Sequence, residues 1–205
     1  MCMIKRGDFV KCTTNNYSIT NRDTICLVIN DSDSWSDLIS SNITVMVVED
    51  YSKNRGFKGI GSIYTVAKDH FEKIDYTDIY GKDRERTHKL IMKLAKADKP
   101  LTREKITNYA SERQLSTHFS SRRGNIFYFT YVEDYVLKSY QIDLDMVTDR
   151  PRYIFFHEIN CLDIKGTFDY GELRNIEGLL QRNEKNVKTT KLFERNMFKP
   201  SISWV

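Results

Sequence analysis

The chain has 205 residues, of which 40% are hydrophobic and 29% charged, and its formal net charge is +4. This composition predicts an ordered globular protein, and the length suffices for one large domain or two small ones. No apolar run approaches the roughly 18 residues of a membrane-spanning helix, and no signal-peptide core is present. We therefore expect a cytoplasmic protein without a membrane segment.

The sequence contains no motif of metal or cofactor chemistry. Its four cysteines, Cys2, Cys12, Cys26 and Cys161, form no CxxC pair and have no histidine at zinc-site spacing. A P-loop, GxGxxG, GxSxG and HExxH are all missing. We expect no metal, no cofactor and no disulfide, and the residues do not favour an enzyme.

The positive charge is concentrated in the middle of the chain. Residues 1–80 hold 9 Lys/Arg and 11 Asp/Glu, residues 81–131 hold 12 and 5, and residues 132–205 hold 11 and 12. The three parts therefore carry net charges of −2, +7 and −1. A local basic field attracts polyanions, so the middle part is a candidate nucleic-acid-binding segment.

Five short runs rich in β-branched and aromatic residues predict a small barrel over residues 1–76. The runs cover residues 4–12, 24–29, 43–48, 62–66 and 71–74. In the third run Ile43, Val45 and Val47 share one face, while Met46 and Val48 make the other face apolar too. This strand is predicted to be central, or packed against the second half of the chain.

The segments Gly7-Asp8-Phe9-Val10, Tyr17–Thr20, Asp23–Cys26 and Tyr64–Val66, with Phe71, resemble SH3-like or KOW-type small barrels. They are also similar to the opening domain of uncharacterised proteins of large bacteriophages, which would place the protein in a host cytoplasm. The resemblance implies a fold and no activity. In one loop of this unit, basic residues alternate with aromatic ones, which suits binding to bases and phosphates; a mobile hairpin tip is the alternative. The basic residues of this loop are Lys53, Arg55 and Lys58.

After a linker at residues 77–83, apolar periodicity predicts helices over 84–97 and 103–112, the second capped by Thr102. A third short helix is expected within 114–123, before a strand at 126–132. This layout resembles a winged helix-turn-helix, which implies that the third helix reads bases and the following arginines contact phosphates. A helical hairpin with a solvated basic face is the alternative. The candidate nucleic-acid-binding residues are Arg103, Lys105, Ser116, Thr117, His118, Ser120, Ser121, Arg122 and Arg123.

The remaining sequence predicts an antiparallel sheet and a helix, which complete a second domain over residues 84–182. Strands are expected near 135–146 and 153–159, with a third at 161–164. The basic, aromatic stretch 183–205 is predicted to be a docked helix or an arm that orders on a partner. The fold class is thus α+β: a five-stranded small barrel followed by an α+β domain with a winged-helix-like segment.

One enzymatic alternative rests on Asp149, Asp163 and Lys165. A carboxylate followed by Asp-x-Lys on a neighbouring strand resembles the PD-(D/E)xK nucleases, which implies carboxylates that hold Mg²⁺ and a lysine that assists the attacking water. Surface charge on an edge strand is the plainer interpretation.

Three functions therefore stay open at this stage. The first is a non-enzymatic protein that binds DNA or RNA. The second is a protein-interaction module that modulates a host or viral machine, and the third is a Mg²⁺-dependent nuclease. The oligomeric state is left open.

Overall fold

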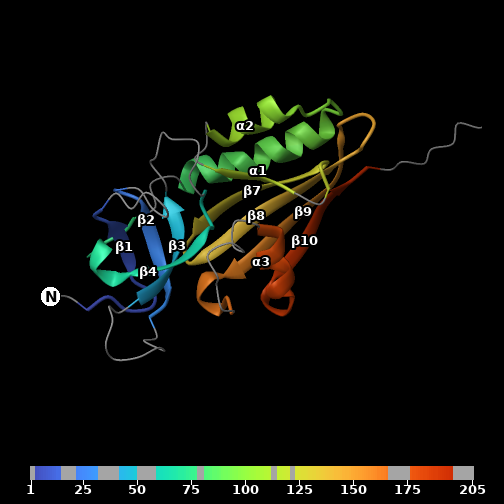
Figure 1. Ribbon diagram of the computed structural model, residues 1–205. Coiled ribbons are helices and arrows are strands. Elements are labelled where there is room, and N and C mark those ends of the chain that lie inside the picture. Colours follow the sequence, from blue (N-terminus) through green and yellow to red (C-terminus); the bar gives the residue numbers. More distant parts are fainter. Residues whose placement is uncertain are drawn as a thin grey trace, which may run out of the picture.

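The computed structural model describes residues 3–14, 22–31, 42–49, 59–77, 81–111, 115–120, 123–165 and 176–195. Within them, two five-stranded antiparallel sheets and three α-helices form a mixed α+β structure (Figure 1), as the sequence predicts. None of the helices in these ranges is both long and apolar enough to cross a membrane.

The first sheet contains the five runs predicted for the N-terminal unit. Its strands are β1 Phe9–Cys12, β2 Ile25–Asn30, β3 Asn42–Glu49, β4 Ile63–Ala67 and β5 Phe71–Ile74. They are ordered β4-β3-β2-β1-β5, and a single 3₁₀ turn at Lys68–His70 joins β4 to β5. The five strands are confirmed, but no closed barrel is found, because β4 and β5 are the two edges of this sheet in the described residues.

Strand β3 is buried on both faces, which confirms the two-sided apolar pattern of the sequence. Ile43, Val45 and Val47 belong to a small core formed within the first sheet. Met46 and Val48, on the other face, belong to the large core shared with the helices and the second sheet. The strand is therefore both central in its sheet and packed against the second half of the chain.

The second sheet has the order β10-β9-β8-β7-β6. Its strands are β6 Ser116–Phe119, β7 Ile126–Glu133, β8 Val136–Leu144, β9 Pro151–Asn160 and β10 Lys188–Glu194. Asp134 and Tyr135 join β7 to β8 with φ angles of 46° and 64°. Two positive φ angles are typical of the tight turns that match the right-handed twist of a hairpin.

Helices α1 Gly81–Lys96 and α2 Arg103–Ser111 lie side by side along one face of the second sheet (Figure 1). His88 Nδ1 lies 2.9 Å from the hydroxyl of Tyr140 on β8, and the Arg103 guanidinium lies 4.4 Å from the ring centre of Phe119 on β6. Helix α3 Ile176–Arg182 lies on the other side of the sheet (Figure 1). Its Glu177 accepts a hydrogen bond from the Ser120 hydroxyl, at 2.9 Å.

The two sheets meet through close contacts of side chains with side chains and with backbone. A β-carbon at Gly59 would lie 1.7 Å from Ser116 Oγ, so only glycine fits there without a shift of Ser116. The ring of Phe9 in β1 packs against Tyr135 of the β7–β8 turn, with centroids 5.2 Å apart. The Arg6 side chain donates to the carbonyl oxygen of Leu162. The junction thus joins the first sheet to one end of the second sheet, where β8 begins and β9 ends.

Three predicted elements are wrong. Residues 116–119 form the edge strand β6, paired with β7, instead of a third helix. Residues 161–163 form a 3₁₀ turn instead of a strand. Much of the predicted C-terminal tail is ordered, since Lys188–Glu194 pairs with β9 as the other edge of the sheet. A winged-helix segment therefore lacks its reading helix in the described residues.

Candidate nucleic-acid interface

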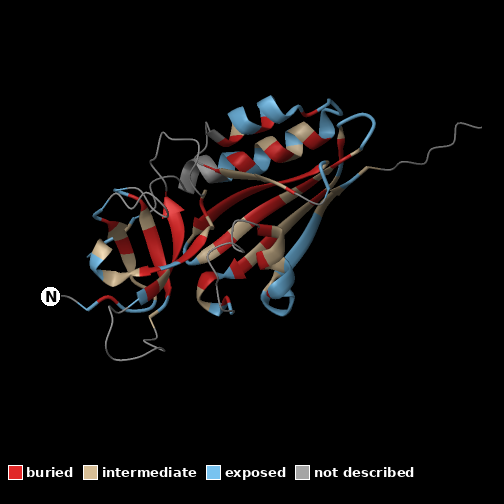
Figure 2. Ribbon diagram, in the orientation of Figure 1, coloured by how far each residue is buried: buried red, intermediate tan, exposed pale blue. Residues whose placement is uncertain are grey.

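Helix α1 presents a row of cationic side chains on its outer side. Thr87, Ile91 and Ala95 recur every four residues and are at most 2% exposed, so they fix the inward face of the helix. The outer row, which is exposed at every position, consists of Arg86, Lys89, Lys93 and Lys96. Figure 2 shows the exposed outer sides of α1 and α2 and their buried sides against the sheet. At about 1.5 Å of rise per residue, the row extends over roughly 15 Å.

Few carboxylates neutralise this row. Residues 85–111 contain seven Lys/Arg and three Asp/Glu, a net charge of +4. Lys89 pairs with Glu85 one turn earlier at 3.2 Å, and both side chains are about three-quarters exposed. In the described part of the chain, Lys93, Lys96 and Lys99 have no ion pair. Exposed pairs are weak, so the row keeps most of its positive potential.

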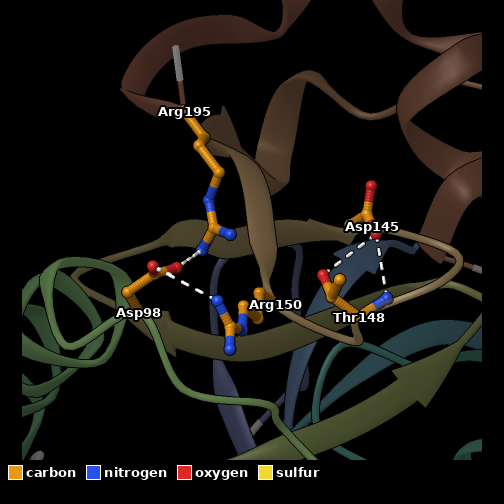
Figure 3. Close-up of polar contacts among 5 residues, drawn as sticks. All are labelled: Asp98, Asp145, Thr148, Arg150 and Arg195. Carbon is orange, nitrogen blue, oxygen red and sulfur yellow. Dashed lines mark hydrogen bonds and ion pairs between the residues drawn. The ribbon is translucent and has the colours of Figure 1, made fainter. Parts of the chain in front are cut away.

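At the end of α1, Asp98 joins three elements that are distant in sequence. It lies in the connection to α2 with a φ of 53°, a conformation that Asp tolerates better than most residues. Arg150 Nη1 from the β8–β9 connection lies 3.4 Å from Asp98 Oδ2, and Arg195 beyond β10 pairs with Asp98 Oδ1. Figure 3 shows both guanidinium groups directed at this one carboxylate. Two cations share one anion, so the cluster has an excess of one positive charge.

The turn between β8 and β9 is held by the side chain of Asp145. Its Oδ1 accepts hydrogen bonds from the N–H and hydroxyl of Thr148, both at 2.9 Å (Figure 3). It also accepts one from the backbone N–H of Val147 at 3.1 Å. These bonds to Thr148 and Val147 lower the pKa of the Asp145 carboxyl below its ordinary value. The turn is tied to the helices by a hydrogen bond of 2.9 Å from Leu101 N–H to Asp149 O.

Met146 and Val147, at the apex of this turn, are 83% and 90% exposed. In the sequence, Tyr140, Ile142, Leu144 and Met146 alternate with polar residues, which is typical of one face of a strand, and the first three are buried. Strand β8 ends at Leu144, however, so the alternation does not continue to Met146. The sequence pattern that could have predicted this turn is the Asp145-x-x-Thr148 spacing, because a short polar side chain at the first position can accept hydrogen bonds across a turn.

Of the predicted nucleic-acid-binding residues, Arg103 and Lys105 are exposed on α2, and Arg123 is exposed after β6. The strand residues Ser116, Thr117 and His118 are only half-buried, whereas Ser120 is buried and bonded to Glu177. They do not form the base-reading surface of a helix. The remaining predicted residues, Ser121, Arg122, Lys53, Arg55 and Lys58, lie outside the described residues.

The three residues of the nuclease alternative are not brought together. Asp149 precedes β9, whereas Asp163 and Lys165 follow its other end. A ten-residue strand separates them, which at about 3.3 Å per residue is roughly 30 Å. No cluster of three or more His, Cys, Asp or Glu side chains suited to a metal ion occurs in the described ranges. Two Mg²⁺-holding carboxylates cannot meet at this distance.

His157 of β9 is only 9% exposed, and its pKa is strongly shifted. Its Nδ1 lies 2.9 Å from Thr189 Oγ1 and its Nε2 lies 3.0 Å from Gln141 Oε1. Burial lowers the pKa of His157 to about 4, because a buried imidazolium loses its hydration. The side chain is a neutral link between three strands.

Comparisons of this chain with models of protein families, with curated proteins and with solved structures give no match.

Proposed function

We propose that this is a non-enzymatic protein that binds DNA or RNA through the cationic outer side of α1 and α2. The observation that carries the proposal is the exposed cationic row on α1, which Lys99 extends. In the described residues, Lys93, Lys96 and Lys99 have no ion pair. The row is held on a helix that is fixed by its buried face, so the charges are in place before a ligand arrives.

The physical basis of binding would be the release of counterions from a phosphate backbone. Duplex DNA carries one negative charge per about 1.7 Å of its axis, so a row of roughly 15 Å spans several phosphates. Lysines act as point charges on phosphate and read no base sequence. Because the predicted reading helix is instead strand β6, we propose binding that depends on charge and backbone, with little sequence preference.

The test is the affinity of a fluorescent duplex, measured by anisotropy at low salt. A Lys93→Gln/Lys96→Gln/Lys99→Gln variant should bind about tenfold or more weakly, because it removes three phosphate contacts. The matched control removes three lysines that already have carboxylate partners at 2.5–2.9 Å, namely Lys11, Lys73 and Lys191. Equal losses in both variants would show that net charge alone matters, and would remove the proposed surface.

The N-terminal unit supports a related proposal. Its five consecutive antiparallel strands, with β5 returning to pair with β1, follow the order expected of SH3-like small barrels. We propose on this basis that residues 1–76 are related to such barrels, and that the protein belongs to a bacteriophage as the sequence resemblance implies. In this proposal the unit serves to dock or orient the second sheet, through the contacts of Phe9 and Gly59.

A second candidate function is a protein-interaction module. The observation that favours it is β10, a seven-residue edge strand in which Lys188–Lys191 are exposed. Such an edge can accept a strand from a partner protein. Purification with and without nuclease distinguishes the two functions: a partner retained after nuclease treatment favours the protein module, whereas release of the bound material favours nucleic acid.

A further inference from the structure

We infer that Met146 and Val147 form an apolar wedge that enters between neighbouring base pairs of duplex DNA while the cationic row of α1 holds the backbone. This inference rests on the proposed function and names the substrate class of that surface, a deformable duplex. It follows from four features: exposure, rigidity, surrounding charge and shape.

Exposure distinguishes this pair from other apolar surface. Single exposed apolar side chains are ordinary, but two adjacent ones at the apex of a turn form a projecting point. In the described residues only two other large apolar side chains are exposed, Met3 at 69% and Tyr135 at 38%, and Tyr135 belongs to the junction between the sheets. The wedge is thus the most exposed apolar feature of the second sheet.

Rigidity makes the pair suitable for insertion. Asp145 closes the turn from inside with three hydrogen bonds, and the N–H of Asp149 donates to Asp145 O at 2.9 Å. The base of the turn is fixed to the helical layer by Leu101 and by the pair Arg150–Asp98. Little backbone freedom would be lost when the apex enters a ligand, so less of the free energy of burial is offset by ordering.

The charges around the wedge favour an anionic ligand. Lys96 and Lys99 are exposed at the end of α1, beside the Asp98 cluster that joins the turn to this helix. Arg150 and Arg195 both pair with Asp98 at the base of the turn, while Lys96 and Lys99 have no ion pair in the described residues. Asp98 and Asp145 are engaged in ion pairs and hydrogen bonds, so cations dominate what a ligand meets.

The shape of the tip suits a DNA groove. Leu144 bonds to Asn125 and Asp149 bonds to Leu101, but residues 145–148 make no backbone hydrogen bond to another segment in the described residues. The major groove of DNA, about 12 Å wide, admits a two-stranded β-ribbon. Proteins that kink DNA insert side chains such as Met, Leu or Ile between base steps and hold the phosphates with Lys and Arg.

The experiment uses the full chain and duplex DNA that contains the fluorescent base 2-aminopurine, whose emission rises when it is unstacked. Wild-type protein at saturation should raise the emission several-fold at one or more positions. A Met146→Ser/Val147→Ser variant should bind about tenfold more weakly and give no rise at saturation. Both positions are exposed, so the variant should fold as the wild type does, and Met3→Ser is the matched control at another exposed apolar site.

The outcomes separate the wedge from the proposed function. Binding of wild-type protein without any rise in emission, or an equal rise with the double variant, overturns the wedge and leaves the proposed function standing. Failure of wild-type protein to bind duplex DNA overturns the wedge, and failure to bind both DNA and RNA overturns the proposed function as well. Sedimentation with vesicles containing phosphatidylserine is the third arm: vesicle binding that requires Met146 and Val147, with unchanged DNA binding, reassigns the apex to a membrane and overturns the wedge.

Discussion

Gly61 lies against Leu137 where the two sheets meet: a β-carbon built on Gly61 would stand 3.0 Å from Leu137 Cδ1 and 3.1 Å from Thr130 Cγ2. Gly61 also has a φ of 90°, a conformation that side chains disfavour. Glycine is therefore favoured at position 61 for two reasons: the positive φ angle, and the close approach of Leu137 and Thr130.

Gly61→Ala should lower the free energy of unfolding by about 2 to 3 kcal/mol, since it adds both backbone strain and a steric clash. Gly7→Ala is the matched control, because Gly7 has a φ of 88° but nothing within 4 Å of an added β-carbon. It should cost only about 1 kcal/mol. Urea denaturation of both variants measures the difference, and equal losses would mean that the close contact at the junction is absent.

His157 should make stability depend on pH. Its pKa in the folded protein is about 4, against an ordinary value of 6.5. Between these pH values the unfolded chain is protonated at His157 and the folded protein is not. Stability is therefore complete above about pH 6.5 and falls as the pH drops towards 4, by up to about 3 kcal/mol from this group. Unfolding of wild type and His157→Gln at several pH values checks this prediction. The difference between them should shrink on acidification, and a difference that stays constant from pH 7 to pH 4 would contradict the prediction.

Thr102 should stabilise the start of α2. Its Oγ1 lies 3.4 Å from the backbone N of Lys105, in the position of a helix cap. Thr102→Ala should cost about 1 kcal/mol. Thr107→Ala removes a hydroxyl that only donates back to the carbonyl of Arg103 within the same helix, and should change stability by less than about 0.5 kcal/mol. Chemical denaturation measures both variants. If Thr102→Ala cost no more stability than Thr107→Ala, Thr102 would not be the cap of α2.

The sequence predicted the elements whose signals are local. The five N-terminal runs, α1 and α2 were found because β-branched residues and the helical spacing of Thr87, Leu90, Ile91 and Leu94 are visible in short windows. The start of α2 followed from Thr102. The two apolar faces of β3 were also correctly predicted, and only the structure assigned them to two different cores.

The elements that failed depend on pairing with distant residues. Strand β6, Ser-Thr-His-Phe, has no strong preference of its own and becomes a strand because it pairs with β7. Strand β10 is equally polar and is held by β9. Of the candidate site, the basic segment and the residues Arg103 and Lys105 came from the sequence. The Asp98 cluster did not, because it joins residues 98, 150 and 195 through tertiary structure alone.

The charge of Asp98 should stabilise the fold and weaken the binding of DNA. Asp98→Asn keeps a residue that tolerates the positive φ but removes the charge shared by Arg150 and Arg195. Because Asp98 is half-exposed, the loss of stability should be modest, about 0.5 to 1 kcal/mol, and smaller at high salt. DNA affinity should rise roughly threefold, since two guanidinium groups lose their shared anion. Asp69→Asn, far more exposed and in contact only with His70 at 3.9 Å, is the control and should change neither quantity.

The dependence of affinity on salt tests the central claim most directly. For duplex DNA, the slope of log K against log[salt] falls by about 0.9 for each phosphate contact. Removing Lys93, Lys96 and Lys99 together should reduce the magnitude of the slope by about 2 to 3, whereas the control that removes Lys11, Lys73 and Lys191 should leave it nearly unchanged. Identical slopes for wild type and the first variant would contradict the assignment of α1 as the surface that holds nucleic acid.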